Sequence, residues 1–427
     1  MRFERGLDFA RAQDAADPLA SFRDRFTIPK RPDGTDVIYL CGNSLGLQPT
    51  EAVSLVREEL EAWGAMAVSA HFAAERPWLS YADRLAPAAA ALVGAHPSEV
   101  VTMNTLTVNL HFMMVSFYRP TADRRKVLIE QPAFPSDRYA VESQIRLHGF
   151  DPADSLIEVG PRPNESVIRM EDLETCICAE GSTIALVLLP GVNYYTGQVF
   201  DMAAITRLGQ EQGCVVGFDL AHAVGNISLR LHDWNSDFAV WCSYKYLNGG
   251  PGAVGGCFVH DRHRDWLDKP RLAGWWGHDP ASRFQMGPDF IPISGAGGWQ
   301  VSNVPILSLA PVLASLNIFE EAGMEALTAK SDRLTSYLAY LVREELGARV
   351  EILTPLESGR RGCQLSLRVR GTRADQRRAF EALETHGVVC DWREPDVIRA
   401  APVPLYNRFE DVCEFVGVLQ RALVLDS

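Results

Sequence analysis

Short apolar segments alternate with helix-like segments between about residues 98 and 260 of this chain. The apolar segments are almost continuously hydrophobic, which is typical of strands that are buried on both faces of a parallel sheet. The predicted strands cover residues 127–130, 183–189, 215–219, 238–243 and 253–260, and the predicted helices cover residues 108–115, 135–148 and 202–212. This alternation predicts an α/β fold with a mostly parallel sheet between two layers of helices.

The flanking segments follow other patterns. Helical periodicity covers residues 50–63, after a charged helical stretch near the N-terminus and a turn-rich segment at residues 39–47. A long helical region is predicted at residues 311–346. The tail then predicts strands at 364–369, 388–391 and 397–400 and helices at 374–386 and 410–423. We therefore expect a large domain at residues 61–310, a smaller α+β domain at 311–427, and an N-terminal segment, 1–60, that packs with the small domain.

Composition narrows the class of protein. The 427 residues are 47% hydrophobic and 22% charged, and the net charge of −13 gives no reason to bind nucleic acid or an anionic membrane. The nine Cys residues show no paired spacing, so we expect reduced thiols and neither a disulfide framework nor a metal site. The N-terminus is charged throughout, and apolar runs fall short of the roughly 18–20 residues that span a bilayer. These features predict a cytoplasmic protein.

The residues that carry most information follow two neighbouring predicted strands. Asp219 ends one strand, and Lys245 comes after the next, between Ser243-Tyr244 and a Gly-rich turn. Strand ends in α/β folds meet at the edge where ligands bind. A lysine that forms a Schiff base and a carboxylate that pairs with a pyridinium nitrogen are what pyridoxal phosphate (PLP) requires. A surface lysine and a helix-capping aspartate would explain either residue alone, but not the pair at one edge.

Longer motifs carry a family resemblance. The segment GFDLAHAVGNISLRLHDWNSDFAVWCSYKYLNGGPG resembles the cofactor-lysine region of the kynureninase family. Similar matches are YLCGNSLGLQPT, TLTVNLHFMM, FPSDRYAVESQIRLHG, GVNYYTGQVFDM, GWWGHDPASRFQM, VSNVPILSLAPVLASLNIFEEAG and VIRAAPVPLYNRFEDV. They extend from about residue 39 to the C-terminus. The resemblance implies the PLP-dependent transferase fold type I, of the class V aminotransferase kind, with a seven-stranded, mostly parallel sheet and a smaller α+β domain.

The same resemblance implies an activity and roles. The reaction is the hydrolysis of L-kynurenine to anthranilate and L-alanine, or of 3-hydroxy-L-kynurenine to 3-hydroxyanthranilate and L-alanine. Lys245 binds PLP as a covalent aldimine and moves the α-proton, with Tyr244 as a second proton donor. Asp219 pairs with the pyridinium nitrogen, His222 approaches the ring oxygen, and Asp137 reinforces the charge or caps its helix. The implied cofactor contacts are Leu106, Thr107, Phe134, Pro135, Ser136, Asp137, Asp219, His222, Tyr244 and Lys245, with Trp275 and Asn303 from the neighbouring subunit of a homodimer.

Phosphate and aromatic contacts also have a physical basis. Thr105-Leu106-Thr107 precedes a predicted helix, whose N-terminal amides favour a phosphate; an ordinary threonine N-cap is compatible with this. The ring of Phe134 suits stacking on an electron-poor pyridinium, although a core position would equally suit a phenylalanine. Trp275 and its neighbour Trp276 could as well form a dimer surface or fill a core.

Substrate recognition requires a cation for the amino-acid carboxylate, because bidentate pairing with arginine gives both energy and orientation. Arg399 matches the arginine that the family uses, and its place in the small domain makes closure on the substrate plausible. By resemblance, His71, Ser44 and Asn303 line the aromatic end of the substrate. Pro190 departs from the family pattern, in which a hydroxyl residue more often contacts the cofactor at this position.

Three other functions would require other sequence features. A cysteine desulfurase-like lyase on the same fold needs a mobile reactive cysteine, whereas Cys242 precedes the lysine on a predicted buried strand. A nicotinamide-dependent oxidoreductase needs a G-x-G-x-x-G turn between a strand and a helix, with an acidic residue about 20 positions on. The glycines at 249–256 follow a predicted strand but lead into another strand. A non-catalytic relative would be expected to have lost Lys245, Asp219 or Arg399. The preference for kynurenine or its 3-hydroxy derivative stays open, as does a role in tryptophan catabolism or in NAD supply.

Overall fold

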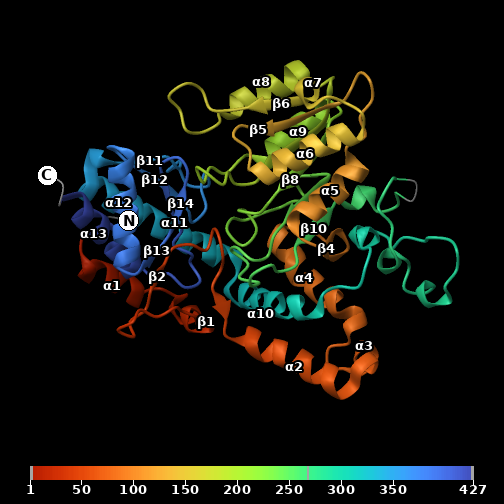
Figure 1. Cartoon of the computed structure of the whole chain (residues 1–427), viewed down its shortest axis with the longest axis horizontal. Coiled ribbons are helices and arrows are strands. Elements are labelled where there is room, and N and C mark those ends of the chain that lie inside the picture. Colours follow the sequence, from red (N-terminus) through yellow and green to blue (C-terminus); the bar gives the residue numbers. More distant parts are fainter. Residues whose placement is uncertain (1–2, 267–268, 425–427) are drawn as a thin grey trace.

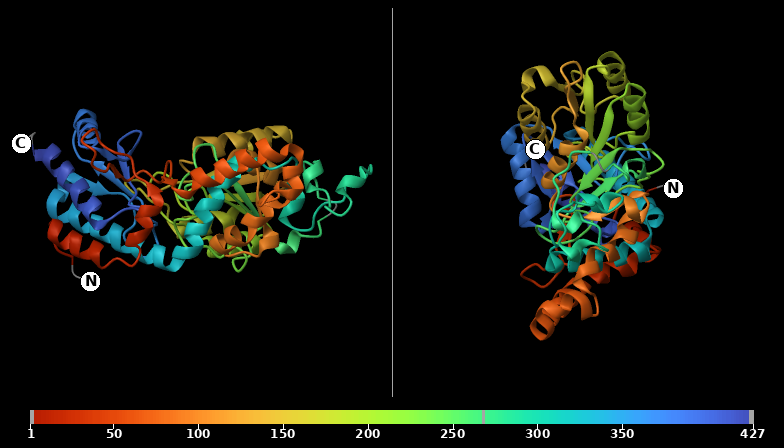
Figure 2. Two further views of the ribbon diagram at one scale, coloured as in Figure 1. Left: turned by 90° about the horizontal axis from the view of Figure 1, so that it is seen from below. Right: turned by 90° about the vertical axis from the view of Figure 1, so that its right-hand side faces the viewer.

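The computed structural model describes residues 3–266 and 269–424. Two β-sheets lie side by side, each covered by helices, and both chain termini are at the end of the smaller sheet (Figures 1 and 2). Residues around 275–300 project from the opposite end of the molecule.

The larger sheet has seven strands. In spatial order they are β4 (Val100–Thr102), β10 (Gly256–Val259), β9 (Phe238–Trp241), β8 (Val215–Asp219), β7 (Ile184–Pro190), β5 (Lys126–Glu130) and β6 (Leu156–Val159). Strand β10 is antiparallel to both of its neighbours, and the other pairs are parallel. The predicted seven-stranded, mostly parallel sheet is confirmed.

Helices cover both faces of this sheet because alternate strand residues point in opposite directions. On β5, Val127 and Ile129 pack into one buried cluster, whereas Leu128 belongs to the other. The first cluster includes residues of α5 (Leu106–Phe117) and α6 (Pro135–Leu147). The second includes residues of α4 (Tyr81–Val93), α8 (Met170–Glu180) and α9 (Met202–Glu211). The sheet therefore has an apolar core on each side.

The smaller sheet is antiparallel and has its own core. Its order is β11 (Val350–Ile352), β12 (Leu365–Val369), β15 (Val397–Ala400) and β14 (Asp391–Arg393). Residues of α11 (Met324–Leu341), α12 (Arg373–Thr385) and α13 (Phe409–Val424) belong to this core, and so does Ala10 near the N-terminus.

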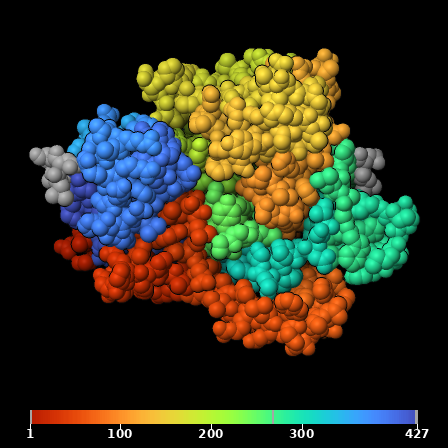
Figure 3. Space-filling model, in the orientation of Figure 1, coloured from red at the N-terminus to blue at the C-terminus, as the bar shows by residue number. Residues whose placement is uncertain are grey.

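The N-terminal segment packs on this smaller body. Helix α1 (Leu7–Ala15) contacts α13, and β2 (Ile38–Tyr39) pairs in parallel with β13 (Val388–Val389). In the space-filling view the red N-terminal residues lie directly against the blue C-terminal ones (Figure 3). A short antiparallel pair, β1 (Phe26–Thr27) with β3 (Gln48–Pro49), then leads to α2 (Glu51–Met66).

Helix α10 (Ile306–Ala322) joins the two bodies and differs from the prediction. The helical region predicted at residues 311–346 is two helices, because Gly323 ends α10 with a φ of 73° and α11 begins after it. The strand predicted at residues 388–391 is also divided, into β13 and β14. Within the described residues, no single helix is long and apolar enough to cross a membrane. Helix α10 and the segment Met324–Arg349 together have the length and composition of a membrane span, but the two are bent by 83° relative to each other.

Candidate active site

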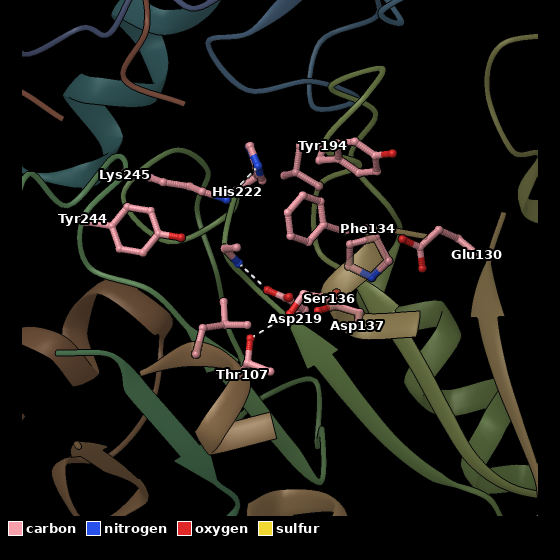
Figure 4. Close-up of a pocket in the computed structure, with 14 residues that line it drawn as sticks. Thr107, Glu130, Phe134, Ser136, Asp137, Tyr194, Asp219, His222, Tyr244 and Lys245 are labelled. Atoms are coloured by element: carbon pink, nitrogen blue, oxygen red, sulfur yellow. Dashed lines mark hydrogen bonds between the residues drawn. The ribbon is translucent and has the colours of Figure 1, made fainter. Parts of the chain in front are cut away.

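A pocket lies where three neighbouring parallel strands end. Glu130 at the end of β5, Pro190 at the end of β7 and Asp219 at the end of β8 all line it (Figure 4). The pocket encloses about 520 Å³, including its open mouth. This is the sheet edge at which ligands of open α/β folds bind, as the sequence predicted for Asp219 and Lys245. Pro190, the departure from the family pattern, cannot donate a hydrogen bond there.

Lys245 enters the pocket from the turn after β9. The turn is closed by two main-chain hydrogen bonds, from N–H of Asn248 to O of Lys245 (2.9 Å) and from N–H of Gly249 to O of Ser243 (2.8 Å). The lysine Nζ lies 5.9 Å from the ring centres of both Phe134 and Tyr244. The amine is thus held between two aromatic rings. Burial raises the pKa of the Tyr244 phenol well above its usual value, so this phenol keeps its proton at neutral pH.

His222 binds the lysine directly. Its Nε2 lies 3.0 Å from Nζ of Lys245 (Figure 4). Burial, and then the positive charges of Lys245 and Arg399, lower the pKa of His222 well below its usual value. The neutral imidazole therefore accepts a hydrogen bond from the ammonium group, which leaves the proton on Nδ1. Within the described residues, the buried Nδ1 has no hydrogen-bond partner, so it can donate to a ligand.

Asp219 and Asp137 form a buried acidic pair. Oδ1 of Asp219 accepts the N–H of Ala221 at 2.7 Å. Burial raises the pKa of Asp219, and burial together with the neighbouring Asp219 carboxylate raises the pKa of Asp137 well above its usual value. Asp137 is therefore the carboxyl that holds a proton, and Asp219 keeps the negative charge. A cation beside the pair would be stabilised by that negative charge. This is the role that the resemblance implied for Asp219 toward a pyridinium nitrogen.

Two helix N-termini meet on another wall of the pocket. Leu106 and Thr107 belong to the first turn of α5, and Ser136 to the first turn of α6, which Pro135 begins. Oγ1 of Thr107 lies 2.9 Å from Oγ of Ser136. First-turn N–H groups have no partner within their helix and favour an anion. Thr105 makes no side-chain cap on α5, so the ordinary N-cap explanation is not observed.

Arg399 lies behind this pocket, in the smaller sheet. Its side chain is 2% exposed and is paired with the carboxylate of Asp391. Nη1 donates to the main-chain oxygen of Tyr194 at 2.6 Å, and Tyr194 lines the pocket. Burial lowers the pKa of Arg399 to about 10, so the guanidinium is still charged at neutral pH.

Six of the predicted residues are not among those that line this pocket: Arg399, Pro135, Ser44, His71, Trp275 and Asn303. Ser44 is exposed and lies in a turn that contacts the lysine segment. In this turn the N–H of Gly46 donates to the main-chain oxygen of Tyr244 at 2.8 Å. His71 is half-buried on α3 (Ala70–Ala73), with its ring centre 5.1 Å from that of Trp78. Trp275 is 41% exposed, and its indole donates to the oxygen of Arg283 at 3.0 Å. Asn303 lines a separate groove beside the start of α5.

Two residues that line the pocket, Glu130 and Tyr194, were not predicted from the sequence. Burial raises the pKa of Glu130 to about 8. The signal for Glu130 was its place at the end of a buried strand, four residues before the FPSD motif. An acidic residue at a strand end is the pattern that had identified Asp219. The ring centre of Tyr194 lies 5.3 Å from that of Phe134.

Comparison with known proteins identifies the family of this chain. The family model described as Kynureninase C-terminal domain matches residues 327–419. The kynureninase of Koribacter versatilis (strain Ellin345) is 55% identical to this chain over 97% of the chain and 97% of its own length. The kynureninase of Xanthomonas oryzae pv. oryzae (strain PXO99A) is 58% identical over 96% of this chain and 97% of its own length. The chain belongs to the kynureninase family.

Solved structures of other enzymes share the fold of this kynureninase family member. A cysteine desulfurase from Thermococcus onnurineus NA1 has a TM-score of 0.73 and is 17% identical, with 94% of this chain and 99% of that chain covered. The cystine C–S lyase C-DES, in complex with cysteine persulfide, has a TM-score of 0.76 at 17% identity over 91% of this chain and 98% of that chain. The fold is that of PLP-dependent enzymes of fold type I, as predicted.

Proposed function

We propose that the chain is a PLP-dependent hydrolase that cleaves the Cβ–Cγ bond of L-kynurenine, with water, to give anthranilate and L-alanine. The observation that carries the proposal is the pocket in which Lys245, His222 and Asp219 converge, in a chain 55% identical to a kynureninase over 97% of its length. The 3-hydroxy derivative, which would give 3-hydroxyanthranilate, is the second candidate substrate.

The residues present fit PLP. Asp219 offers a buried negative charge, and Oδ1 of Asp137 and Nδ1 of His222 are buried polar atoms without a partner in the described chain. Phe134 offers an aromatic face. We assign the phosphate to the first turn of α5 and to the hydroxyls of Thr107 and Ser136. When bound, the cofactor withdraws electrons from the carbon that carries the substrate amino group.

Lys245 and Tyr244 are the proposed catalytic residues. The amine of Lys245 would bind the aldehyde carbon of the cofactor covalently. Once the substrate amine replaces it there, the lysine is free to move the proton of the substrate α-carbon. Tyr244 keeps its phenolic proton because burial raises its pKa, so it can donate that proton when the aryl acid leaves and alanine forms.

Different residues are assigned to the two ends of the substrate, the amino-acid carboxylate and the aromatic ring. Arg399 would bind the amino-acid carboxylate, since a buried guanidinium gives two parallel hydrogen bonds and a full charge. Ser44, His71 and Asn303 remain candidates for the aromatic end. Ser44 is best supported, because its turn is attached to the lysine segment through Gly46.

A different PLP lyase is the alternative, because the structural neighbours include a cysteine desulfurase. Desulfuration needs a reactive thiol that reaches the substrate. None of the described residues that line the pocket is cysteine, and Cys242, next to the lysine turn, is buried. Burial also raises the pKa of the Cys242 thiol, which disfavours the reactive thiolate. These observations favour hydrolysis of kynurenine.

We further propose a homodimer in which Trp275 and Asn303 reach the phosphate of the neighbouring subunit. Both residues lie outside the pocket of their own chain. Large apolar side chains are exposed on the same part of the molecule, and an apolar surface of this kind is typical of an interface. They are Trp63, Val68, Phe72, Phe284, Met286 and Ile291. Phe72 and Phe284, 6.5 Å apart between ring centres, join the α3 and 275–300 segments into one surface.

The remaining assignments are proposals of the same kind. The division into residues 1–60, 61–310 and 311–427 is supported by the packing of α1 on α13, although α10 crosses the boundary at 310 and packs on α2 and α4. We place the enzyme in the cytoplasm, in the kynurenine pathway of tryptophan catabolism and pyridine nucleotide (NAD) biosynthesis.

The test is a visible absorption spectrum of the purified protein, followed by L-kynurenine while anthranilate fluorescence is recorded. A yellow band that borohydride abolishes, together with anthranilate, is the expected result. A yellow protein that forms no anthranilate would point first to 3-hydroxy-L-kynurenine and then to another PLP reaction. A protein that stays colourless with added PLP would overturn the proposal.

A further inference from the structure

Arg399 already has a carboxylate partner within its own chain. In the β14–β15 pair Asp391 stands directly opposite Arg399, so the two side chains meet across the strands. The contact joins Nη2 of Arg399 to Oδ2 of Asp391, and the two side chains are 2% and 16% exposed. A guanidinium buried to this degree requires a counter-charge, and Asp391 supplies it.

The same aspartate oxygen has a second cation. Nη2 of Arg393 lies 2.7 Å from Oδ2 of Asp391, and the Arg393 side chain is 32% exposed. Two guanidinium groups therefore share one carboxylate, which leaves a net charge of about +1. Within the described residues, Nε of Arg393 and Nε of Arg399 are buried without hydrogen-bond partners, so both arginines retain unused donors.

This group of three side chains does not line the pocket but is connected to it through Tyr194. Arg399 donates to the oxygen of Tyr194, which lines the pocket. The positive charges of Arg399 and Arg393 both contribute to the lowered pKa of His222, whose imidazole contacts Lys245. The spare positive charge thus acts on the residues around the cofactor lysine, where the carboxylate of an amino acid would arrive.

We propose that Asp391 is an exchangeable internal counter-ion of Arg399, a positioning residue that the substrate carboxylate displaces while Arg393 retains the aspartate. This inference rests on the proposed role of Arg399. Before substrate binds, Asp391 occupies the guanidinium. When the substrate carboxylate takes its place, Asp391 keeps an ion pair through Arg393 and is not left as an unpaired buried charge. Substrate affinity is then reduced by the fraction of enzyme in which Asp391 still occupies Arg399.

The proposal predicts opposite effects for two variants. Asp391→Asn keeps an oxygen acceptor but removes the competing charge, so an amino acid should bind about tenfold more tightly. Arg393→Gln removes the cation that retains Asp391, so the aspartate competes more strongly and the amino acid should bind about tenfold more weakly. A merely structural role for the three residues would weaken binding in both variants.

The measurement is titration of each PLP-loaded enzyme with L-alanine, followed by the visible absorption of the cofactor. L-Alaninamide, which lacks the carboxylate charge, is the matched ligand, and its affinity should not change. The matched variant is Glu394→Gln, in the same hairpin, whose carboxylate pairs with Arg373 and Arg377 on α12 instead. Its affinity for L-alanine should equal that of the wild type. Thermal unfolding shows whether each variant folds. If Asp391→Asn or Arg393→Gln does not fold, the affinity of the other variant tests the proposal alone.

The outcomes separate this inference from the proposed reaction. Weaker L-alanine binding in folded Asp391→Asn, or unchanged binding in folded Arg393→Gln, would overturn the counter-ion role. Because L-alanine binding needs no turnover, the opposite shifts can be observed even in an enzyme that forms no anthranilate. That result would reject the kynurenine reaction and keep the exchange of carboxylates at Arg399.

Discussion

Nε2 of His222 lies 3.0 Å from Nζ of Lys245, so the neutral imidazole is the hydrogen-bond acceptor of the lysine ammonium group. The two residues come from turns after adjacent strands, β8 and β9, and Asp219 begins the first of these turns. The lysine is therefore fixed at the sheet edge by a partner that carries no charge. When the amine reacts with an aldehyde, this contact has to be exchanged, and His222 becomes available to the ligand.

Replacing Lys245 by Ala should abolish turnover and the covalent attachment of PLP while leaving the fold intact. The side chain lies in a solvent-connected pocket, so its loss creates no closed cavity in the core. Borohydride treatment followed by mass measurement should find labelled wild-type protein and unlabelled Lys245→Ala. The matched control is Lys126→Ala, which removes a half-exposed lysine paired with Glu180 and should change neither property. Normal activity in Lys245→Ala would contradict the proposed role of Lys245.

The two buried aspartates should respond differently to the same change. Asp219 carries the negative charge, so Asp219→Asn should lower kcat/KM by about 100-fold or more, which corresponds to the ~3–5 kcal/mol cost of a buried charge that loses its partner. Asp137 holds a proton because burial and the Asp219 carboxylate raise its pKa, so the neutral amide in Asp137→Asn is a close replacement. Its loss should be less than about tenfold. Steady-state kinetics of both variants with saturating PLP decides, and equal losses would contradict the assignment of the proton.

The central strands and the lysine site could be predicted because their signals are local. Residues 215–219 and 397–400 are short, mostly apolar segments with one charged residue each, and the structure has strands at both places. Asp219 and Lys245 follow consecutive strands, and parallel strands bring such ends to one edge. The pocket that these two residues share could therefore be predicted without knowledge of contacts between segments far apart in the sequence.

The parts that sequence could not give depend on tertiary contacts. Nothing in the apolar pattern of residues 311–346 distinguishes one bent region from two helices, and the break depends on the positive φ of Gly323. The ion pair of Arg399 with Asp391 depends on strand register, which a one-residue shift would abolish. The end of a buried strand marked Glu130 in the sequence, but its proximity to Asp219 depends on the order of β5, β7 and β8 in the sheet.

The buried carboxylate of Glu99, which does not line the pocket, should contribute to stability. The Glu99 side chain is fully buried and accepts the N–H of His96 and the N–H of Asp261, each at 2.8 Å, as well as Nδ1 of His232 at 2.9 Å. Glu99→Ala leaves these donors without their acceptor, so the free energy of unfolding should fall by about 3–5 kcal/mol. Urea unfolding measures it. Glu321→Ala, which breaks an exposed pair with Arg25, should cost less than about 1 kcal/mol, and similar losses would contradict the role of Glu99.

Glu130 should make the protein less stable as the pH rises. Burial raises its pKa in the folded state from the ordinary value of 4.5 to about 8. The folded protein therefore binds a proton that the unfolded chain releases, so the stability from this group is complete below about pH 4.5 and is lost progressively up to about pH 8. The difference corresponds to roughly 4 kcal/mol at the upper end of that interval.

Glu130→Gln removes this dependence because the amide stays neutral at every pH. The variant should match the wild type in urea unfolding near pH 5 and be more stable by a few kcal/mol near pH 8, with both proteins free of PLP. Glu211→Gln, which replaces an exposed glutamate paired with Arg207 on α9, should follow the wild-type curve at both pH values. A Glu130→Gln curve parallel to that of the wild type would mean that Glu130 is already ionised in the folded protein, and that the acidic group beside Lys245 carries one more negative charge than Asp219 alone provides.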